Sequence, residues 1–177
     1  KNFEAEPVTW TGANSSNWNV DADVNFKSIS DEPAKFLNGA PVTFDDNATN
    51  TNIVLTSNVA PAAVTFANQT KAYTLSGDYI IDNTPEIMKE GAAKTTINNI
   101  NNVGNTTIAG GSLYAASLAN NVGTDMGSLG TKDKTITLMN GGTFGVVGSN
   151  EGAHKIICST GNGQIDVPSG ATFTQTG

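Results

Sequence analysis

Arginine is absent from this 177-residue chain, and positive charge is scarce. Nine lysines stand against sixteen aspartates and glutamates, which gives a formal net charge of −7 and a pI near 4.4. Nucleic acids and anionic membrane surfaces bind through basic patches, so this balance argues against both as partners. Without arginine there are also no guanidinium groups for bidentate recognition of phosphate or carboxylate. The composition therefore predicts a neutral, polar surface over a β-rich core.

Cysteine and histidine each occur once, which removes several classes of site. Cys158 cannot form an intrachain disulfide, and its place in the apolar run 155–158 predicts a buried, unreactive thiol. His154 is the only histidine, and one histidine with one cysteine cannot supply a zinc site of the usual composition; no Gly-x-Ser-x-Gly motif accompanies it. We therefore expect His154 to be a hydrogen-bonded turn or surface residue. Apolar runs of about 18 residues, which a membrane-spanning helix needs, are also absent.

From residue 37 onward, short apolar triplets recur between Asn, Asp, Gly, Ser and Pro. They lie at 42–44, 53–55, 64–66, 73–75 and 79–81. In most of them a Thr or Val separates two larger apolar residues, as in strands with one buried face. The Val-Thr-Phe triplets at 42–44 and 64–66 are 22 residues apart, with another triplet midway. Such an interval is typical of successive coils of a β-solenoid, so we predict that these two triplets pair in parallel on one sheet.

A second phrase recurs in the C-terminal half of the chain. It reads Gly-Gly-Ser-Leu at 110–113, Gly-Gly-Thr-Phe at 141–144 and Ser-Gly-Ala-Thr-Phe at 169–173. Each copy follows a strand-like segment, so the pattern predicts a strand, a glycine turn and a strand in every coil. Residues 85–90 are expected to form another strand and turn, and the alternative is one short helix that Gly91 would end within two turns.

Residues 1–36 differ from the rest of the chain. They contain both tryptophans, Trp10 and Trp18, and three of the seven phenylalanines, but no tandem strand pattern. A solenoid must cover the open end of its first coil, because an uncovered edge strand promotes aggregation. We therefore expect an aromatic-rich N-terminal cap at 1–36 and β-helix coils at 37–177. Because the last residues stop within a repeat, we expect the coils to continue beyond them.

Several short motifs follow one another in a characteristic order. Residues 8–18 have a Trp-x-Gly followed by a second Trp, residues 39–44 read Gly-Ala-Pro-Val-Thr-Phe, and residues 106–113 contain Thr-x-Ile-x-x-Gly-x-Leu. Over about residues 8–113 this order resembles the passenger-associated transport repeat regions of autotransporter-type and other bacterial surface proteins, although Asn25-Phe26 stands where Asn-Trp is usual. The resemblance implies an all-β, right-handed parallel β-helix exported to the cell surface. It implies no activity, because β-helices carry adhesins, lyases and inert stalks alike.

Trp10 and Trp18 are the candidate ligand-binding residues. Indole faces pack against the apolar faces of pyranose rings, and Trp10, Trp18 and Phe26 are spaced by eight residues each. This spacing suits aromatic side chains on successive strands or turns. A sugar-stacking platform is therefore one interpretation of the cluster, and a structural cap is the other.

Polar clusters elsewhere are expected to serve turns and corners. Asp21, Asp23, Asn25 and Glu32 partly follow a calcium loop, but Phe26 stands where such a loop needs glycine. Residues 45–47, Asp-Asp-Asn, follow a strand and are expected to stabilise its turn. Asparagine pairs are expected to stack in hydrogen-bonded ladders at coil corners. They lie at 98–99, 101–102 and 120–121.

These features favour a non-catalytic, extracellular β-helix module of a bacterial surface or secreted protein, acting as an adhesin or stalk. The expected partner is a neutral glycan or a protein surface, with no nucleic acid, no direct membrane insertion, no metal ion and no cofactor. The alternative is an accessory or partial domain of a secreted carbohydrate-active enzyme, either a polysaccharide lyase or a glycoside hydrolase. β-Helical lyases pair calcium-bound carboxylates with an Arg or Lys base, and this chain has no arginine and no acidic triplet.

Overall fold

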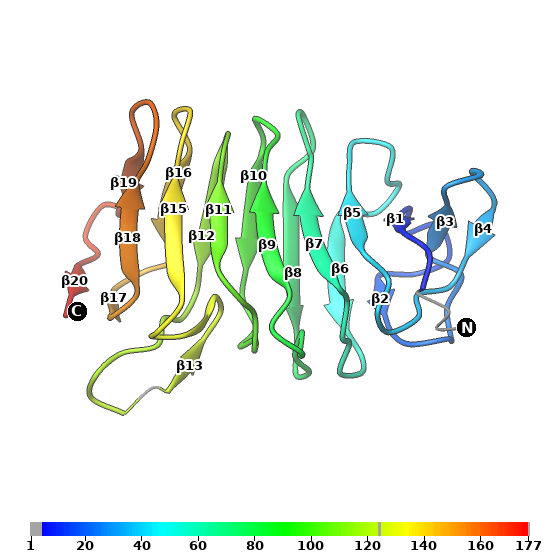
Figure 1. Cartoon of the computed structure of the whole chain (residues 1–177), viewed down its shortest axis with the longest axis horizontal. Helices are drawn as coiled ribbons and strands as arrows, with labels where there is room; N and C mark the ends of the chain where they lie inside the picture. Colours follow the sequence, from blue (N-terminus) through cyan, green and yellow to red (C-terminus); the bar gives the residue numbers. More distant parts are fainter. Residues whose placement is uncertain (1–4, 124, 177) are drawn as a thin grey trace.

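The structure, a computed structural model, describes residues 5–123 and 125–176. Within these residues the fold is all-β, with twenty strands and no helix. Two large sheets run along the long axis of the molecule, and their strands lie across that axis (Figure 1). Successive coils each supply one strand to each sheet, so the prediction of a parallel β-solenoid is confirmed. Its right-handed sense stays a prediction.

The first sheet has nine strands and the second has seven. In sheet order the first contains β4 (Pro33–Ala34), β3 (Phe26–Ser28), β1 (Val8–Trp10), β5 (Val42–Phe44), β7 (Ala63–Phe66), β9 (Glu86–Lys89), β11 (Thr106–Ile108), β15 (Thr135–Leu138) and β18 (Lys155–Cys158). The second contains β2 (Asn17–Trp18), β6 (Asn52–Leu55), β8 (Tyr73–Gly77), β10 (Lys94–Ile97), β12 (Ser112–Ala115), β16 (Thr143–Val146) and β19 (Gln164–Asp166). Two short pairs lie outside these sheets: β13 (Met126–Gly127) with β14 (Gly130–Thr131), and β17 (Asn150–Gly152) with β20 (Phe173–Gln175).

The 22-residue interval does mark one coil. Val42 pairs with Val64 and Phe44 pairs with Phe66, in parallel and on the same sheet, as predicted. All four side chains are buried, and the two phenylalanine rings stack with their centroids 4.8 Å apart. The midway triplet lies in β6 of the second sheet. Alternation of inward and outward residues thus packs the inner faces of the two sheets against one continuous core.

A third, less regular side closes each coil between the two sheets. Val59 and Ile81 form a parallel bridge, and backbone hydrogen bonds of 2.8 Å continue it from the N–H of Asp82 to Val59 and from the N–H of Asn102 to Ile81. The strand predicted at 79–81 is wrong, because the chain turns here between β8 and β9 and only Ile81 joins the bridge.

The glycine phrases behave differently from one another. The first two occupy equivalent places, since Leu113 of β12 pairs with Phe144 of β16. The third does not, because Ile165 of β19 takes the place opposite Phe144, whereas Phe173 of β20 pairs with β17. The turn before β19 uses Gly161, which has φ +73° and therefore suits a residue without a Cβ. In the last coil the strand of the first sheet is therefore β18, and the segment at 165–167, predicted for that place, belongs to the second sheet.

The strand pairing confirms one expectation and corrects another. Residues 86–89 form strand β9, as the favoured interpretation of this segment predicted, and the short helix considered as the alternative does not form. Residues 1–36 do not lack coil strands, because β1 pairs in parallel with β5 and β2 pairs in parallel with β6. Beyond β1, strands β3 and β4 add in antiparallel orientation. The parallel stack of the first sheet therefore ends in an antiparallel hairpin.

Candidate functional site

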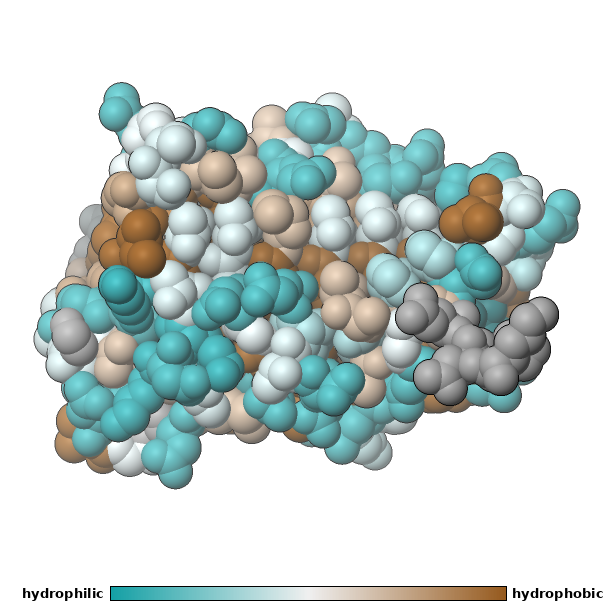
Figure 2. All heavy atoms as spheres, viewed as in Figure 1, coloured by the Kyte–Doolittle hydropathy of each residue, from teal (hydrophilic) through white to brown (hydrophobic). Residues whose placement is uncertain are grey.

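The outer face of the nine-stranded sheet carries a row of threonines. One half-buried residue of each parallel strand lies at the same register, between inward-facing neighbours. From the N-terminal end the row reads Thr9, Thr43, Thr65, Met88, Thr107, Thr137 and Ile157. In the space-filling view, side chains of near-neutral hydropathy follow one another along the long axis across this face, with hydrophilic groups above and below them (Figure 2).

The geometry of this row suits a repeating, uncharged ligand. Neighbouring strands lie about 4.8 Å apart, so the hydroxyls of Thr43 and Thr65, and those of Thr107 and Thr137, repeat at roughly that interval. Each hydroxyl offers one donor and two acceptor lone pairs. Within the described part of the chain, none of these four hydroxyls hydrogen-bonds to protein. The row can therefore bind hydroxyl-bearing molecules that lie along the solenoid axis.

The sequence contains the signal for this row, but we did not predict the row from it. In the sequence, the middle residue of each triplet indicated only that its two larger neighbours face the same side of a strand. That Thr43, Thr65 and Thr107 share one line depends on the register of strands that lie 19 to 23 residues apart. Because coil lengths vary, counting residues does not reveal which side chains align.

The outer face of the seven-stranded sheet is occupied by its own side chains. The ring of Tyr114 lies on Gly145, where any side chain would collide with it, and the Lys94 Nζ lies 3.8 Å from the ring centroid. The Tyr114 hydroxyl donates a hydrogen bond to the Asp166 carboxylate, which raises the pKa of Tyr114 to about 12. These contacts connect four coils. They also cover part of the Tyr114 ring.

Trp10 and Trp18 are fully buried, so neither indole presents a surface face on which a sugar could stack. The Trp10 Nε1 donates a hydrogen bond of 2.7 Å to the backbone oxygen of Asn50. The Trp18 ring packs edge-on against Phe36 and Phe44, with centroid distances of 5.4 Å to both. The two tryptophans thus belong to the core at the N-terminal end.

The polar groups that partly follow a calcium loop are used within the fold. Asn25 is buried, and its Oδ1 accepts from the N–H groups of Asn14 and Ser15 at 2.9 and 2.8 Å. Asp23 accepts from Ser15 and Asn17, and these hydrogen bonds, that of Ser15 first, lower the pKa of its carboxyl. Side chains that could hold an ion here instead fix the loop between β1 and β2.

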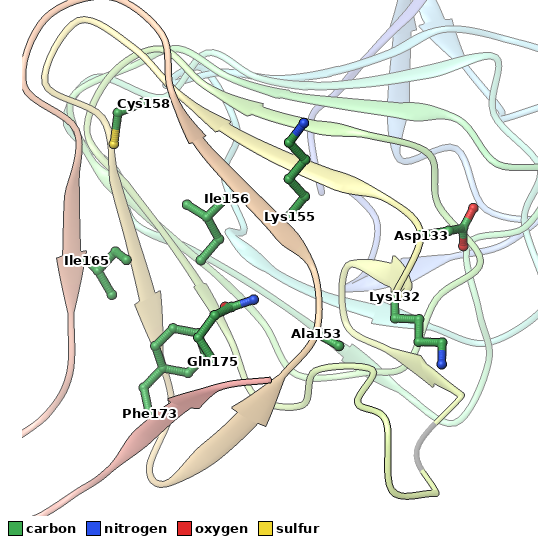
Figure 3. Close-up of a pocket in the computed structure, with 9 residues that line it drawn as sticks. All are labelled: Lys132, Asp133, Ala153, Lys155, Ile156, Cys158, Ile165, Phe173 and Gln175. Carbon is green, nitrogen blue, oxygen red and sulfur yellow. The ribbon is translucent and has the colours of Figure 1, made fainter. Parts of the chain in front are cut away.

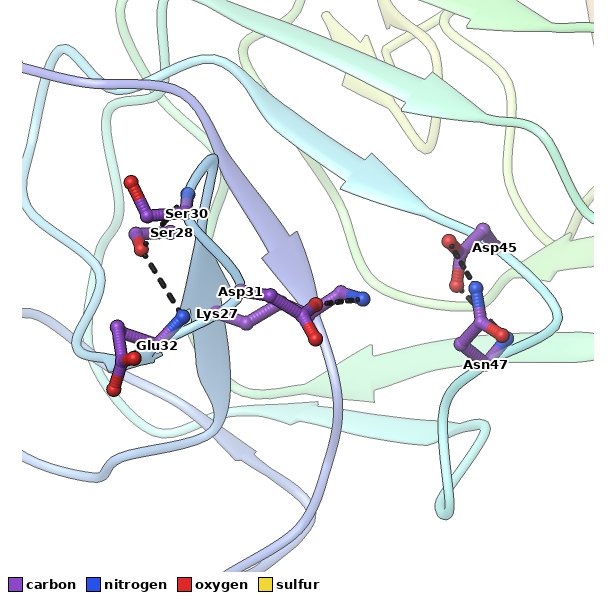
Figure 4. Close-up of polar contacts among 7 residues, drawn as sticks. All are labelled: Lys27, Ser28, Ser30, Asp31, Glu32, Asp45 and Asn47. Carbon is purple, nitrogen blue, oxygen red and sulfur yellow. Dashed lines mark hydrogen bonds and ion pairs between the residues drawn. The ribbon is translucent and has the colours of Figure 1, made fainter.

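Asp45 and Asp46 serve turns, as predicted. The Asp45 carboxylate accepts two hydrogen bonds of 2.9 Å from Asn47, one from the backbone N–H and one from the side-chain amide (Figure 4). The Asp46 carboxylate accepts from the N–H groups of Gln69, Thr70 and Lys71 in the next coil, at 2.9 to 3.1 Å. These backbone hydrogen bonds, that of Lys71 first, lower the pKa of Asp46. This carboxylate therefore joins two coils.

His154 and Cys158 both differ from expectation. His154 is buried rather than on the surface, and its Nε2 lies 3.2 Å from the Leu129 carbonyl oxygen of the β13–β14 hairpin. Burial lowers the pKa of its imidazole. Cys158 is exposed rather than buried. The alternation of β18 does direct Cys158 inward, but no further strand covers it on that side within the described residues.

Lys89 is the one charged side chain in the core of the described residues. It lies in β9 between Phe66 and Ile108, the paired positions of the neighbouring strands, and its Nζ donates to the backbone oxygen of Gly91. Burial lowers the pKa of the ammonium group to about 8. No titratable partner contacts it among the described residues, so we assign it no chemical role.

Asn99 and Asn101, one from each of the two asparagine pairs in 98–102, hydrogen-bond to each other and to backbone oxygens. Asn101 is buried, its Oδ1 accepts from the N–H of Ile81, and its Nδ2 donates to the backbone oxygen of Ser128. Asn99 donates to Tyr79 in the preceding coil. The predicted hydrogen bonding at coil corners is confirmed for these two residues, but they do not form a ladder of stacked side chains, because their amides also bond to main-chain groups.

Two apolar cavities lie at opposite ends of the solenoid. One, of about 680 Å³, lies at the C-terminal end, and its lining includes Ile156, Cys158, Ile165 and Phe173 (Figure 3). The other, of about 460 Å³, lies at the N-terminal end beside β1 and β4. Among the described residues, no group of three or more His, Cys, Asp or Glu side chains is placed to hold a metal ion.

The described part of the chain contains no helix long and apolar enough to cross a membrane. Comparisons with protein-family models, with curated proteins and with solved structures find no match for this chain. The site therefore has to be interpreted from its own geometry.

Proposed function

We propose that this protein is a non-catalytic, extracellular surface module that binds neutral glycan along the threonine row of its nine-stranded sheet. The observation that carries the proposal is the alignment of Thr9, Thr43, Thr65, Thr107 and Thr137 in one register column. A polysaccharide lying along the solenoid axis would meet hydroxyl groups coil after coil. The stack of coils would at the same time act as a stiff spacer, since each coil contacts its neighbours.

Charge supports a neutral ligand over an acidic one. The chain has a formal net charge of −7, so a uronate polymer would meet charge of its own sign. A neutral sugar needs only hydroxyl hydrogen bonds and contact with apolar groups, and each threonine provides a hydroxyl and a methyl. Such hydrogen bonds contribute about 1 kcal/mol net each, so several of them correspond to millimolar to micromolar affinity.

The surroundings of the titratable groups support a module without catalysis. His154 is buried against backbone, and the carboxylates of Asp23, Asp46 and Asp82 accept hydrogen bonds that hold loops and neighbouring coils. Each of these three carboxyls has a lowered pKa because hydrogen bonds stabilise its charged form. A general acid needs the opposite shift.

The proposal is tested by screening neutral and uronic-acid-containing glycans, followed by a pair of double variants. Thr65→Val with Thr107→Val removes two hydroxyls from the row and keeps the side-chain shape and strand preference. We expect at least about tenfold weaker binding to a neutral glycan, since each 1.4 kcal/mol is a factor of ten.

The matched control is Thr74→Val with Thr96→Val, which removes two paired hydroxyls from the outer face of the other sheet. We expect this control to bind as the unchanged protein does. Equal loss in both double variants, binding confined to uronates, or no glycan binding at all would each refute the proposed ligand site.

A further inference from the structure

The β13–β14 hairpin inserts its turn into the body of the solenoid. These two strands pair in antiparallel orientation within the connection from β12 to β15, which extends beyond the stack of coils in Figure 1. The turn residues Ser128 and Leu129 are nevertheless buried. Gly130 beside them has φ +84°, and a Cβ there would lie 2.5 Å from the backbone oxygen of Val103. The turn is therefore closely packed against the preceding coil.

Hydrogen bonds hold this turn from two sides. Asn101 of the preceding coil donates from its backbone N–H to Gly127 at 3.0 Å and from its Nδ2 to Ser128 at 3.1 Å. On the other side, the Nε2 of His154 lies 3.2 Å from the Leu129 carbonyl oxygen. The imidazole of His154 therefore joins the turn to the coil that follows it.

The imidazole of His154 is enclosed in its neutral form. The residue is 1% exposed. Because a carbonyl oxygen can only accept, Nε2 carries the proton and Nδ1 is the unprotonated nitrogen. Nδ1 is buried and has no hydrogen-bond partner among the described residues. A proton added to Nδ1 would bury a positive charge and an N–H group without an acceptor, and both cost free energy.

The charged groups of the hairpin offset this cost only in part. Burial is the largest effect on His154 and lowers the pKa of its imidazole, whereas two carbonyl groups of the turn and the Asp133 carboxylate favour the charged form. Asp133 also forms an ion pair of 2.8 Å with Lys134. The hairpin's other charged residues, Asp125 and Lys132, are exposed.

The other elements around His154 add little charge. Glu151 in β17 and Lys155 in β18 flank it in the sequence, and neither is among the groups that set its pKa. From β20 the uncharged Gln175 donates a hydrogen bond of 2.8 Å to the His154 backbone oxygen. The neutral imidazole therefore fits its surroundings better than the charged one does.

We propose that His154 is a pH-sensitive switch that holds the β13–β14 hairpin in the solenoid at neutral pH and releases it in acid. In the open form water accepts from Nδ1–H, so the imidazole has its ordinary pKa of 6.5, whereas the closed form has a lower pKa. Between these two values the open form binds more protons. The contribution of His154 to closure is thus fully present above pH 6.5 and is lost as pH falls through the lower pKa. This switch does not depend on glycan binding by the threonine row.

Amide hydrogen exchange of the full chain at pH 7 and pH 5 tests the switch. His154 is the only histidine, so no other side chain of this chain has an ordinary pKa between these values. The reporters are the backbone N–H groups of Asn101 and Ser128, both hydrogen-bonded at the turn, and strands β5 and β7 are the internal control. The matched variant is His154→Gln, whose amide N–H can donate to Leu129 but does not titrate.

After correction for the intrinsic effect of pH on exchange, we expect the two reporter amides to exchange at least about threefold faster at pH 5 than at pH 7. Exchange in β5 and β7, and reporter exchange in His154→Gln, should be the same at both pH values. An NMR titration of the imidazole in the unchanged protein should give a pKa below 6.5, and this measurement does not require the variant to fold. A pKa of 6.5 or above, or equal acid acceleration in His154→Gln or in β5 and β7, would overturn the proposal.

Discussion

The two ends of this solenoid are built differently. At the N-terminal end, Trp18, Phe26 and Phe36 are fully or almost fully buried, and the antiparallel strands β3 and β4 lie beyond the last parallel strand. At the C-terminal end, both sheets finish in parallel edge strands, and Ile165 and Val167 are exposed. The two ends of the described residues therefore share one core pattern but differ in how much of it they leave exposed.

The difference lies in side-chain volume and strand direction. Edge-to-face contacts join Trp18 to Phe26, Phe36 and Phe44, with centroid distances of 5.4 to 6.2 Å. Large rings fill the wide interior that the next coil would otherwise fill. At the other end only Phe173 crosses the core, where its ring meets Phe144 at a centroid distance of 6.0 Å. One partly buried ring does not cover the end.

Removing the N-terminal region is expected to have the largest effect. Deletion of residues 1–36 uncovers β5 and β6 and removes the rings that pack on Phe44. We expect a lower melting temperature and aggregation through the newly exposed edges. Differential scanning calorimetry and light scattering measure the two effects. A truncated chain that stays monomeric with unchanged stability would show that this end is no more closed than the other.

Single ring deletions at the two ends sharpen the comparison. Trp18→Ala should lower the free energy of unfolding by about 3–5 kcal/mol, because the ring is fully buried. Phe173→Ala should lower it by about 1–2 kcal/mol, because that ring is only partly buried. Urea denaturation of both variants gives the two values. Equal losses would mean that both ends are equally packed.

Between the two ends, the core contains one buried ammonium group, that of Lys89, among the described residues. Its pKa is lowered to about 8, so between about pH 8 and 10.5 the unfolded chain binds more protons, and stability rises with pH across that window. The cost of burying the ammonium is fully present below pH 8. Lys89→Met should therefore raise the free energy of unfolding at pH 7 by about 3 kcal/mol, with a gain that shrinks toward pH 10.5.

The matched control is Lys35→Met, since Lys35 is exposed and pairs with Asp21 at the surface. We expect a change in the free energy of unfolding within about 0.5 kcal/mol. Urea denaturation at pH 7 and near pH 10 measures both variants. A destabilised Lys89→Met chain would show that the amine holds the coil together rather than weakening it.

Asp46 gives the smallest expected effect, near the N-terminal end. Its lowered pKa means that its stabilisation is present above the ordinary pKa of 3.8 and is lost as pH falls through the lower folded pKa. Asp46→Ala should lower the melting temperature at neutral pH and flatten its decline in acid. Thermal melts across the acid range, with Asp78→Ala as an exposed control, measure the difference. Parallel acid profiles for the two variants would contradict the coil-joining role of Asp46.

Strand alternation was readable from the sequence because it depends on adjacent residues alone. The triplets at 42–44, 53–55 and 64–66 are strands, and the 22-residue spacing placed two of them on one sheet. The site was not readable in the same way. Trp10 and Trp18 attracted attention as aromatic residues, but burial depends on what packs over them, and both are inside.

The sequence by itself determined that the chain is all-β, that it coils in parallel, and that its surface is poor in charge and rich in hydroxyls and amides. The strands and the surface follow from composition and from a two-residue period, which are local, and the parallel coiling follows from the 22-residue spacing of the two Val-Thr-Phe triplets. Only the tertiary structure decided that Thr65 lines up with Thr43, that Lys89 points into the core, and that Cys158 stands at an open end. Register, depth and end coverage depend on residues about 20 or more positions away, and coil lengths that vary hide those partners from any local pattern.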